Sequence, residues 1–401
     1  MIAPRARTEA ASRSVTILGS TGSVGCNTVD LLARQPAAFA VEALTANRNV
    51  KLLVEQALAL RPRMVAVADH TCYRPLKDAL FGSGIEVAGG PQAVIEAAMR
   101  PADWVMASIV GAAGLEPTMA AVRRGAVIGL ANKECLVCAG DLMIAEIKKC
   151  GATLVPVDSE HSAIFQVFDF DNAEKVEQII LTASGGPFRC TDIADLADVT
   201  PAQAVAHPNW DMGAKISVDS ATMMNKGLEL IEAFHLFPVG AAQIGIVVHP
   251  QSVIHSMVAY VDGSVLAQLG TPDMRTPIAY ALAWPQRMSA PAPRLDFTTI
   301  GALTFERPDE QKFPALRLAR EALRSGGPAP IVLNAANEVA VGSFLAGEIG
   351  FLDICRVVEE TMQLTWNATA SCISDVIAID QEARRLARDR LQGFRSRPGS
   401  A

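Results

Sequence analysis

The chain has 401 residues, half of them hydrophobic, and a formal net charge of −7 at pH 7. A chain of this size can bury substantial cores and is expected to divide into two or three domains. The acidic balance argues against general nucleic-acid binding, so any phosphate must be held by local groups. No apolar run is long enough to span a membrane, and residues 1–13 carry arginines without a signal-type hydrophobic core, so we expect a disordered leader.

Eight cysteines are scattered along the chain, and only Cys135 and Cys138 are close in sequence. This single C-x-x-C pair has no second ligand pair nearby and falls in a predicted helix. The pattern therefore favours small buried hydrophobic residues over a zinc or redox site. Free thiols are typical of a reducing cytosol, so we expect a cytoplasmic protein.

The first element after the leader is a predicted β-strand over residues 14–18, followed by a glycine turn and a helical pattern over 28–34. The turn, residues 19–25, reads GSTGSVG. Glycines in such a turn let the backbone approach a pyrophosphate, whose charge then sits at the helix N-terminus. The spacing G-x-x-G-x-x-G departs from the commoner G-x-G-x-x-G, so a tight strand-to-helix turn without a ligand stays open as an alternative.

The second predicted strand, residues 40–45, ends where an NAD-specific site would place an acid for the ribose hydroxyls. Here the strand is followed by Asn47, Arg48 and Asn49, with no acid. Arg48 is a suitable partner for the 2′-phosphate of NADP, although a solvated loop arginine is the alternative. The residues favour NADPH as the cofactor.

Further strand and helix units follow along the N-terminal half. The predicted strands lie at residues 64–68, 84–88, 104–109 and 126–130. This alternation predicts a parallel, doubly wound sheet, which binds ligands at the carboxyl ends of its strands. GAAG at 111–114 and ANKE at 131–134 lie at such ends. We expect Lys133 and Glu134 to contact cofactor or substrate, and a plain helix-start pair is the alternative.

Two further segments carry candidate ligands. Asp158 and Glu160 follow the apolar run 152–157. At strand spacing they would point to the same side, which is unfavourable unless a cation or a proton relieves their repulsion. A β-like run over 176–181 leads into a glycine-rich turn at Ser184, whose hydroxyl and backbone N–H groups could hold an anion.

The other motifs converge on residues 207–232. The first half of this stretch is a loop punctuated by Pro and Gly that contains His207, Trp210 and Met212. It is too apolar for an ordinary exposed connection and is therefore a candidate lid. In the second half we expect a helix that begins at Asp219 or Ser220, whose N-terminus would attract an anion.

Three polar residues share one face of that helix. Asn225, Lys226 and Glu229 fall together at i/i+3 and i/i+4 spacing. A surface ion pair between Lys226 and Glu229 on an ordinary core helix is the alternative. Taken with Asp158, Glu160 and the serines, the three residues predict one site that binds a divalent metal beside a phosphate.

The C-terminal part begins with two predicted antiparallel strands, within 245–260 and 264–269, which join at a turn. His249 and His255 lie among apolar neighbours, and we expect both to be structural or interfacial. A Pro-rich linker is predicted over 284–313. The pattern is then helical to about Leu391, which predicts a small bundle before a frayed tail.

Seven motifs in the same order along residues 14–390 resemble those of the 1-deoxy-D-xylulose 5-phosphate reductoisomerase family. They are GSTGSVG at 19–25, LANKE at 130–134, PVDSEHS at 156–162, the Ser184 turn, residues 207–229, residues 249–257 and PDMRTP at 272–277. The resemblance implies isomerisation and reduction of 1-deoxy-D-xylulose 5-phosphate to 2-C-methyl-D-erythritol 4-phosphate on the non-mevalonate isoprenoid pathway. It also implies a homodimer formed through the central domain.

The predicted fold class is α/β, with a Rossmann-like doubly wound N-terminal domain, an α/β central catalytic domain and a C-terminal helical bundle. The predicted limits are 1–13 for the leader, 14–157 for the NADPH-binding domain, 158–283 for the central catalytic and dimerisation domain, 284–313 for the linker, 314–391 for the helical domain and 392–401 for the tail.

By the same resemblance, Asp158, Glu160 and Glu229 are the ligands of Mg²⁺ or Mn²⁺, with Co²⁺ as a further candidate, and with Lys133 they are the catalytic residues. Hard carboxylate oxygens suit such ions. A metal chelated by the substrate's carbonyl and adjacent hydroxyl would polarise the first and acidify the second, which drives a retro-aldol and aldol rearrangement. The resulting aldehyde accepts hydride from NADPH.

The resemblance also assigns the binding residues. The phosphate contacts are Ser184, Ser220, Asn225 and Lys226 with His207 beside them, the substrate's oxygens meet Ser159, Asn209 and Lys133, and Trp210 covers the substrate. The cofactor contacts are Thr21, Gly22, Ser23, Val24, Asn47, Arg48, Asn49, Asn132, Glu134, Met212 and Gly213. A closed lid would keep water away from the reactive aldehyde.

Two other classes of protein share part of this pattern. An NADP-dependent semialdehyde or alcohol dehydrogenase would also have a glycine turn and Arg48, but it needs no three-carboxylate metal site. A non-catalytic NADP sensor could lose the acids of the second half, and this chain keeps them. Metal dependence therefore separates the reductoisomerase from the first alternative.

Overall fold

The structure is a computed structural model that describes residues 12–210, 212–364, 366 and 368–395. Residues 1–11 of the predicted leader and 396–401 of the predicted tail lie outside the described residues. The chain divides into two compact units. Within the described residues, no helix is both long enough and apolar enough to cross a membrane.

The first unit contains residues up to Asn132, Met143–Ser162 and Asp273–Pro293. Its sheet has seven strands in the order β4-β3-β2-β1-β5-β6-β7, and every neighbouring pair is parallel. The strands are β1 Arg13–Leu18, β2 Phe39–Ala46, β3 Met64–Val67, β4 Glu86–Gly89, β5 Trp104–Ala107, β6 Val127–Leu130 and β7 Thr153–Pro156. The predicted parallel, doubly wound sheet is confirmed.

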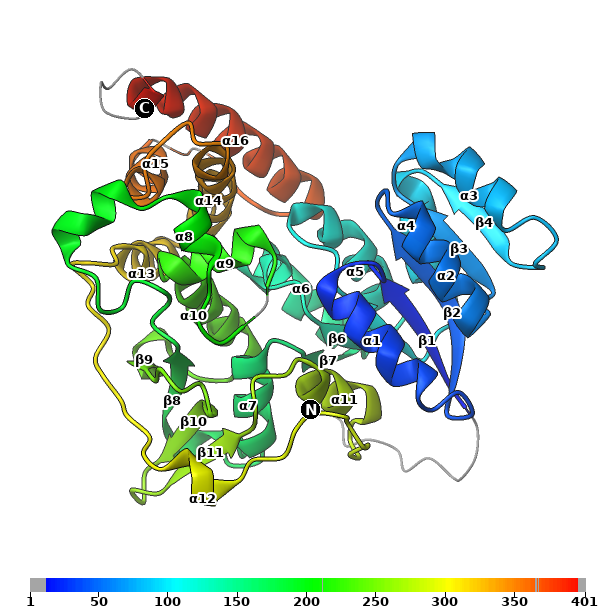
Figure 1. The fold of residues 1–401 in the computed structure, drawn as a ribbon, viewed down its shortest axis with the longest axis horizontal. Helices are drawn as coiled ribbons and strands as arrows, with labels where there is room; N and C mark the ends of the chain where they lie inside the picture. Colours follow the sequence, from blue (N-terminus) through cyan, green and yellow to red (C-terminus); the bar gives the residue numbers. More distant parts are fainter. Residues whose placement is uncertain (1–11, 211, 365, 367, 396–401) are drawn as a thin grey trace. The chain divides into compact units, whose positions relative to one another are not determined.

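Helices cover this sheet, and the first five of them connect its successive strands from β1 to β6 (Figure 1). They are α1 Ser23–Ala33, α2 Val50–Leu60, α3 Tyr73–Ala79, α4 Pro91–Met99, α5 Leu115–Arg123 and α11 Arg275–Ala283. α1 packs against α2 and α11, whereas α4 packs against α5. After β4 the chain returns across the sheet to pair β5 with β1, so the strand order reverses between β1 and β5. Open α/β sheets bind ligands at such a switch point.

The second unit contains Lys133–Leu142, Ala163–Pro272 and the chain from Arg294 on. Its sheet has the order β11-β10-β8-β9. The strands are β8 Val176–Ala183, β9 Ile244–Val248, β10 Ile254–Tyr260 and β11 Val265–Leu269. β10 is antiparallel to β8 and β11, which confirms the predicted hairpin, whereas β9 is a separate strand parallel to β8.

The C-terminal part of this unit is helical, as predicted, and α14 packs against α13, α15 and α16 (Figure 1). The remaining helices are α6 Glu134–Cys150, α7 Ser159–Val167, α8 Pro201–Val205, α9 Ala214–Ala221, α10 Met224–Leu236, α12 Phe297–Ile300, α13 Ala315–Ser325, α14 Ala329–Leu345, α15 Asp353–Met362 and α16 Ile373–Arg395. α16 continues to Arg395, so the residues 392–395 that we expected in the tail are helical.

The prediction that Asp158 and Glu160 lie at strand spacing is wrong. β7 ends at Pro156 and α7 begins at Ser159, so the two acids flank the start of a helix. The backbone N–H of Glu160 donates to Oδ1 of Asp158 at 3.2 Å. This bond is the kind that an acidic residue makes at a helix start, and it replaces the extended geometry that the apolar run suggested.

The predicted helix start at Asp219 or Ser220 is also wrong. Both residues lie near the end of α9, and α10 begins only at Met224. Met223 separates the two helices because its φ is +63°, in the left-handed region. A non-glycine residue rarely adopts this conformation, and no local signal marks it in the sequence, so the break could not be placed from the pattern alone.

Several predictions about buried residues are confirmed. Cys135 and Cys138 are 1% and 6% exposed within α6, as expected for small hydrophobic residues. Burial raises the pKa of the Cys138 thiol well above its ordinary value, so the thiol is protonated and unreactive. His249 and His255 are also buried among the strands of the second unit.

Candidate active site

The glycine turn between β1 and α1 has the geometry of a phosphate-binding turn. Gly19 has a φ of +87°, and a Cβ there would lie 2.9 Å from the carbonyl oxygen of Ser108. A Cβ on Gly25 would lie 2.2 Å from the carbonyl oxygen of Gly19. α1 has Gly22 as its N-cap residue, without a side-chain cap, and Gly22 and Ser23 are exposed. The N-terminus of α1 can therefore receive a pyrophosphate.

A buried pair, Ser20 and Gln56, holds this turn in place. The Ser20 hydroxyl donates to Oε1 of Gln56 at 2.7 Å, and Nε2 of Gln56 donates to the Ser20 carbonyl at 2.9 Å. The Gly19 N–H donates to the hydroxyl of Thr45 at 2.9 Å. We did not single out Gln56 in the sequence, because it lies on α2, distant in sequence from the turn that it supports.

Arg48 lies at the end of β2 with its side chain 76% exposed. Its Nε donates to Oδ2 of Asp69 at 2.6 Å, and Oδ1 of Asp69 accepts from the hydroxyl and N–H of Thr71. The bonds from Thr71, followed by those from Arg48, lower the pKa of Asp69. Asp69 thus holds Arg48 by Nε, a geometry that suits a phosphate contact through the terminal nitrogens. The side chain of Asn49 caps α2 by accepting from Leu52 N at 3.2 Å.

Asn132 is buried at the end of β6, 2% exposed. Its amide nitrogen donates to the carbonyl oxygens of Ile109 and Gly111, the latter at 2.9 Å. These bonds fix the loop that follows β5, beside the point where the strand order reverses. Asn132 therefore helps to shape the carboxyl edge of the first unit's sheet.

Asp158, Ser159 and Glu160 are half-buried at the start of α7. The Ser159 hydroxyl donates to Oε2 of Glu160 at 2.6 Å. Nδ1 of His161 lies 3.5 Å from Oδ1 of Asp158. Two carboxylates two residues apart at a helix start offer hard oxygen ligands, which suit Mg²⁺ and Mn²⁺.

The second unit contains a buried charged cluster centred on Glu229 of α10, which is 1% exposed. Nζ of Lys133 donates to Oε1 of Glu229 at 3.1 Å and to Oδ1 of Asn225 at 2.7 Å. The Asn225 amide donates to Oε1 of Glu229, and Lys226 donates to Oε2. The side chains of Lys133 and Lys226 are 9% and 5% exposed, so the alternative of a surface ion pair is wrong.

The charges in this cluster suit an anionic ligand. Two ammonium groups surround one carboxylate, and Asn225 adds a polar amide on the same helical face. Placing ions in a protein interior costs several kcal/mol each, and pairing them rarely yields net stability. Such a cluster is therefore better explained by ligand binding than by stability, and its two ammonium groups fit a phosphate.

Ser184 and His207, both predicted phosphate contacts, lie together in the second unit. Oγ of Ser184 is 2.9 Å from Nε2 of His207. Nδ1 of His207 accepts from the N–H groups of Asn209 and Trp210, at 3.2 and 3.0 Å, so in the neutral ring Nε2 carries the proton and donates to Ser184. Burial lowers the pKa of His207, which favours this neutral ring. The Ser184 hydroxyl can then donate its own hydrogen to an anion.

The predicted lid loop is docked against the residues that follow β9. The amide nitrogen of Asn209 donates to the carbonyl of Pro250 at 2.7 Å and to the hydroxyl of Ser252 at 3.1 Å. The ring of Trp210 lies 6.2 Å from that of His255. Asp211 lies outside the described residues, and Met212 and Gly213 lead into α9. These contacts order the loop around His207.

Glu134, a predicted cofactor contact at the start of α6, is held by a residue that the sequence analysis did not select. Nζ of Lys215 lies 3.4 Å from Oε1 of Glu134 and 2.8 Å from Oδ2 of Asp219. The i/i+4 spacing of Lys215 and Asp219 could have indicated their pairing. The contact with Glu134 could not have been inferred, because it joins two helices far apart in sequence.

Family models match most of the chain. The model described as 1-deoxy-D-xylulose 5-phosphate reductoisomerase matches residues 15–140, that of its C-terminal domain matches 154–237, and that of the DXP reductoisomerase C-terminal domain matches 269–386. The reductoisomerase of Rhodospirillum centenum is 62% identical over 383 residues, 96% of this chain and 95% of that protein. The chain belongs to the 1-deoxy-D-xylulose 5-phosphate reductoisomerase family.

Solved structures of reductoisomerases agree with this assignment. The enzyme from Zymomonas mobilis in complex with NADPH has a TM-score of 0.91 and 55% identity, and the match covers 95% of this chain and 99% of that one. A reductoisomerase in complex with NADPH, fosmidomycin and magnesium has a TM-score of 0.91 and 42% identity, with 96% of this chain and 99% of the other covered.

Membership of the reductoisomerase family confirms the predicted fold class and the predicted activity. The chain is therefore an oxidoreductase of this family, and the solved structures of its relatives include complexes with NADPH and with magnesium. A simple dehydrogenase and a non-catalytic sensor are thereby excluded as explanations of the motifs. The role of each site residue stays a prediction, and the geometry above is the basis for it.

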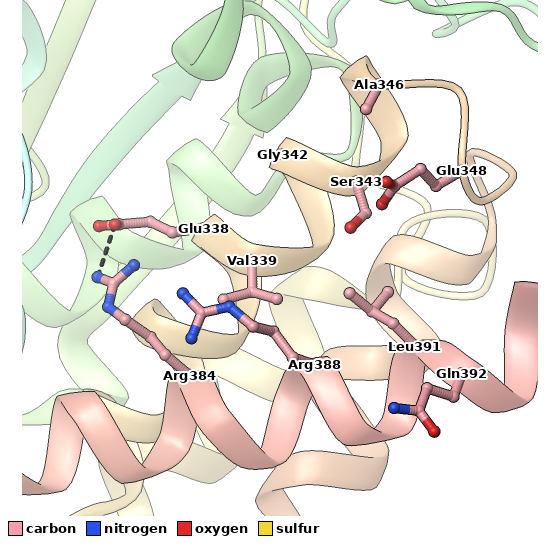
Figure 2. A pocket seen from close by; sticks show the side chains of 10 residues that line it. All are labelled: Glu338, Val339, Gly342, Ser343, Ala346, Glu348, Arg384, Arg388, Leu391 and Gln392. Carbon is pink, nitrogen blue, oxygen red and sulfur yellow. Dashed lines mark hydrogen bonds and ion pairs between the residues drawn. The ribbon is translucent and has the colours of Figure 1, made fainter.

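The chain also has a pocket of about 480 Å³, between α14 and α16 (Figure 2). Its lining residues are Glu338, Val339, Gly342, Ser343, Ala346, Glu348, Arg384, Arg388, Leu391 and Gln392. Arg384 reaches from α16 to pair with Glu338 of α14 at 2.7 Å. None of the predicted cofactor, substrate or metal residues lines this pocket, so its size does not make it the active site.

Proposed function

We propose that the chain catalyses the isomerisation and NADPH-dependent reduction of 1-deoxy-D-xylulose 5-phosphate to 2-C-methyl-D-erythritol 4-phosphate, as a cytoplasmic homodimer. The observation that carries the proposal is the buried carboxylate of Glu229, which accepts hydrogen bonds from Lys133, Asn225 and Lys226. All eight cysteines are free, which suits the reducing cytoplasm.

The metal is expected to bind Asp158, Glu160 and Glu229. All three supply hard carboxylate oxygens, which suit Mg²⁺ or Mn²⁺ and also accept Co²⁺. When bound, the ion polarises a substrate carbonyl and acidifies the adjacent hydroxyl. Lys133, the fourth predicted catalytic residue, directs its ammonium group to Glu229 and Asn225, where it can also bind a substrate oxygen.

The phosphate is expected to lie between the Ser184 turn and α10. Nε2 of His207 donates to the Ser184 hydroxyl, so this hydroxyl can donate its own hydrogen to the phosphate. Lys226 supplies a positive charge and Asn225 an amide. Ser220, half-buried in the last turn of α9, completes the set of predicted phosphate contacts. Charge-assisted hydrogen bonds of this kind are stronger than neutral ones.

The substrate's oxygens are expected to meet Ser159 and Asn209, with Trp210 as a cover. Asn209 is anchored to Pro250 and Ser252, so it is held in a defined orientation. Trp210 is half-buried against His255, and it presents a large apolar surface in an otherwise polar site. A cover of this kind excludes water from a reactive aldehyde.

NADPH would supply hydride to the aldehyde formed by the rearrangement, and the chain's own residues hold the cofactor. Arg48 is positioned by Asp69 for a 2′-phosphate. The proposed contacts are Thr21, Gly22, Ser23 and Val24 in the glycine turn, Asn47, Arg48 and Asn49 after β2, Asn132 and Glu134 after β6, and Met212 and Gly213 before α9.

The proposed dimer forms through the central domain, residues 158–283. β11 is an edge strand of the four-stranded sheet, and Val265 and Leu266 on it are 52% and 50% exposed. Val261, in the turn before β11, is 62% exposed. Exposed apolar residues on an unpaired edge invite association with another chain, and a second copy would cover them. Residues 14–157 then bind NADPH, and 314–391 form the helical domain.

A spectrophotometric assay tests the proposal. Purified protein should oxidise NADPH when 1-deoxy-D-xylulose 5-phosphate and Mg²⁺ are both present, and chelation of the metal should stop the reaction. NADH in place of NADPH serves as the control and should support much slower turnover. NADPH oxidation that does not depend on a divalent metal would contradict the proposed metal-assisted rearrangement and favour a simple dehydrogenase.

A further inference from the structure

A network of polar side chains in the second unit links the C-terminal helices to α9, the helix that follows the lid loop. Its centre is Asp219, whose side chain is 2% exposed. Oδ2 of Asp219 pairs with Nζ of Lys215 at 2.8 Å, and Oδ1 accepts from the amide nitrogen of Asn337 at 2.8 Å. Asn337 is a fully buried residue of α14. Both oxygens of one carboxylate are therefore held, by donors on two helices.

Lys215 extends the network to the start of α6. Its ammonium group also lies 3.4 Å from Oε1 of Glu134, so it bridges two carboxylates from different helices. Burial by itself would lower the pKa of Lys215, but the charges of Asp219 and Glu134 outweigh it and raise the pKa above the ordinary value. Lys215 is therefore charged throughout the physiological range, and its position is set by both carboxylates.

The C-terminal helices contribute a further charge to this network. Glu338, next to Asn337 on α14, also raises the pKa of Lys215 by its charge. Glu338 is itself fixed, because it accepts from Asn334 at 3.1 Å and pairs with Arg384 of α16 at 2.7 Å (Figure 2). The helical part of the unit thus supplies both a direct hydrogen bond to α9 and an ordered negative charge near Lys215.

We propose that Lys215 is a positioning residue for the reductoisomerase reaction and that Asn337 is a second one, which holds the last turn of α9 through Asp219. The inference rests on the proposed function, in which Glu134 contacts the cofactor and Ser220, adjacent to Asp219, contacts the phosphate. Lys215 orients the Glu134 carboxylate by direct contact. It also orients the last turn of α9 through its ion pair with Asp219. The helical domain thereby acquires a role in substrate binding, although it supplies no predicted contact to the substrate.

The two residues should act differently, because their contacts differ. Lys215 touches both Glu134 and Asp219, whereas Asn337 donates to Asp219 only. Loss of Lys215 should therefore weaken both NADPH and substrate binding. Loss of the Asn337 amide should weaken substrate binding and leave NADPH affinity as it is. A residue that serves stability alone would produce no such division between the two ligands.

The experiment compares Lys215→Met and Asn337→Leu with the wild type. NADPH affinity is measured by fluorescence titration without substrate, and KM and kcat are measured for 1-deoxy-D-xylulose 5-phosphate at saturating NADPH and Mg²⁺. Lys215→Met should raise both the Kd for NADPH and the substrate KM by about tenfold, the effect of one lost charge-assisted hydrogen bond. Asn337→Leu should raise the substrate KM alone. Lys215→Arg, which keeps the charge and the donors, should restore most of both affinities.

Arg317→Met is the matched control. Arg317 lies on α13 in the helical part and pairs with Glu321 and Glu359 at 3.0 and 2.8 Å, outside the network. Its loss should leave the Kd for NADPH and the substrate KM unchanged. Such a result would show that removing an ion pair from these helices is not enough to disturb the site.

Several outcomes would overturn the inference. Wild-type constants in Lys215→Met and Asn337→Leu, measured well below lowered melting temperatures, would reduce the network to a structural role. An equal rise in the Kd for NADPH in both variants would contradict the prediction that only Lys215 affects cofactor binding. Should Lys215→Met not fold, Asn337→Leu alone tests whether Asp219 affects substrate binding. A wild type without turnover would instead refute the proposed function, while the NADPH titration would still decide whether Lys215 orients Glu134.

Discussion

The glycine turn of the first unit and the Glu229 cluster of the second unit prepare for negatively charged ligands in opposite ways. The turn offers backbone N–H groups at the exposed start of α1, and its shape depends on Gly19 at a φ of +87°. The cluster offers buried side chains, with two ammonium groups around one carboxylate. The turn is shaped to bind an anion through its backbone, whereas the cluster is suited to bind one through the charges of its side chains.

This difference predicts how each region responds to change. The bonds that hold the turn are neutral and short in range, such as those between Ser20 and Gln56, so the turn is complete without its ligand. The cluster contains ions that were removed from water at a cost of several kcal/mol each, and each ion depends on the others. Substitutions in the turn should act sterically and locally, whereas those in the cluster should alter charge balance, stability and turnover together.

The largest effect is expected for Glu229→Gln. Loss of the charge should lower turnover on the order of a thousandfold by weakening metal binding and charge stabilisation. Both oxygens of Glu229 accept from ammonium groups, so the change weakens two charge-assisted contacts in a buried cluster and should lower the free energy of unfolding by about 3 kcal/mol. A cluster of carboxylates alone would instead predict equal or higher stability.

Calorimetric metal titration, steady-state turnover and urea unfolding measure the three consequences of Glu229→Gln. NADPH affinity is the internal control and should persist, because the glycine turn belongs to the first unit. Wild-type metal affinity together with near-normal turnover in this variant would refute the assignment of Glu229 as a metal ligand.

The second effect is that acid should lower the stability of the second unit, because of His255. Burial lowers the pKa of His255 to about 4 from its ordinary 6.5. As the pH falls through this window, the unfolded chain binds a proton that the folded chain does not. The free energy of unfolding should therefore fall, by about 3 kcal/mol from this group, since His255 is only 7% exposed.

Urea unfolding at pH 7 and pH 4.5 measures the slope of the free energy of unfolding against pH. His255→Gln should be less sensitive to acid than the wild type, because one proton-linked step is removed, while the carboxylates contribute to both proteins. His70, an exposed histidine of the first unit, is the matched control, and His70→Gln should keep the wild-type slope. Equal slopes in the His255 variant and the wild type would contradict the predicted shift.

A smaller effect is expected for Gly19→Ala. The added Cβ would lie 2.9 Å from the carbonyl oxygen of Ser108 in a left-handed conformation, so the turn must distort. This strain of about 2 kcal/mol should weaken NADPH binding by roughly 30-fold. Gly263→Ala is the control, because Gly263 also has a positive φ, of +86°, yet its Cβ would meet nothing within 4 Å. A similar loss of NADPH affinity in both variants would show that the effect does not arise at the turn.

The smallest effect is expected for Arg48→Ala. Loss of the proposed phosphate contact should reduce the preference for NADPH over NADH by about 1.5 kcal/mol, the low end for a charge-assisted hydrogen bond, because the Arg48 side chain is 76% exposed. Asp69, left without its partner, should add to the repulsion of a 2′-phosphate. The ratio of kcat/KM for the two cofactors measures the change, and Arg34→Ala at the C-cap of α1 is a control that should leave this ratio unchanged. Equal use of both cofactors by the wild type would refute the role of Arg48.

Much of the sequence-based prediction rested on patterns among residues that are close in the sequence. The strand, glycine turn and helix over 14–34 depend on neighbouring residues, so their pattern could be recognised directly. Asn225, Lys226 and Glu229 share a face because helical periodicity places them there. Asp219 and Ser220 were misplaced because the break between α9 and α10 depends on the left-handed conformation of Met223, which only surrounding packing can impose.

The sequence by itself determined the parallel sheet, the glycine turn, the apolar loop and the polar face of α10, since each follows from the spacing of residues along a short segment. Only the tertiary structure decided which of these polar groups meet. Lys133 reaches Glu229 across 96 positions, and Asn337 reaches Asp219 across 118. Buried polar groups need partners, and any of many distant residues could satisfy that need. The choice is made by how the helices pack, and the spacing of residues along the chain does not contain it.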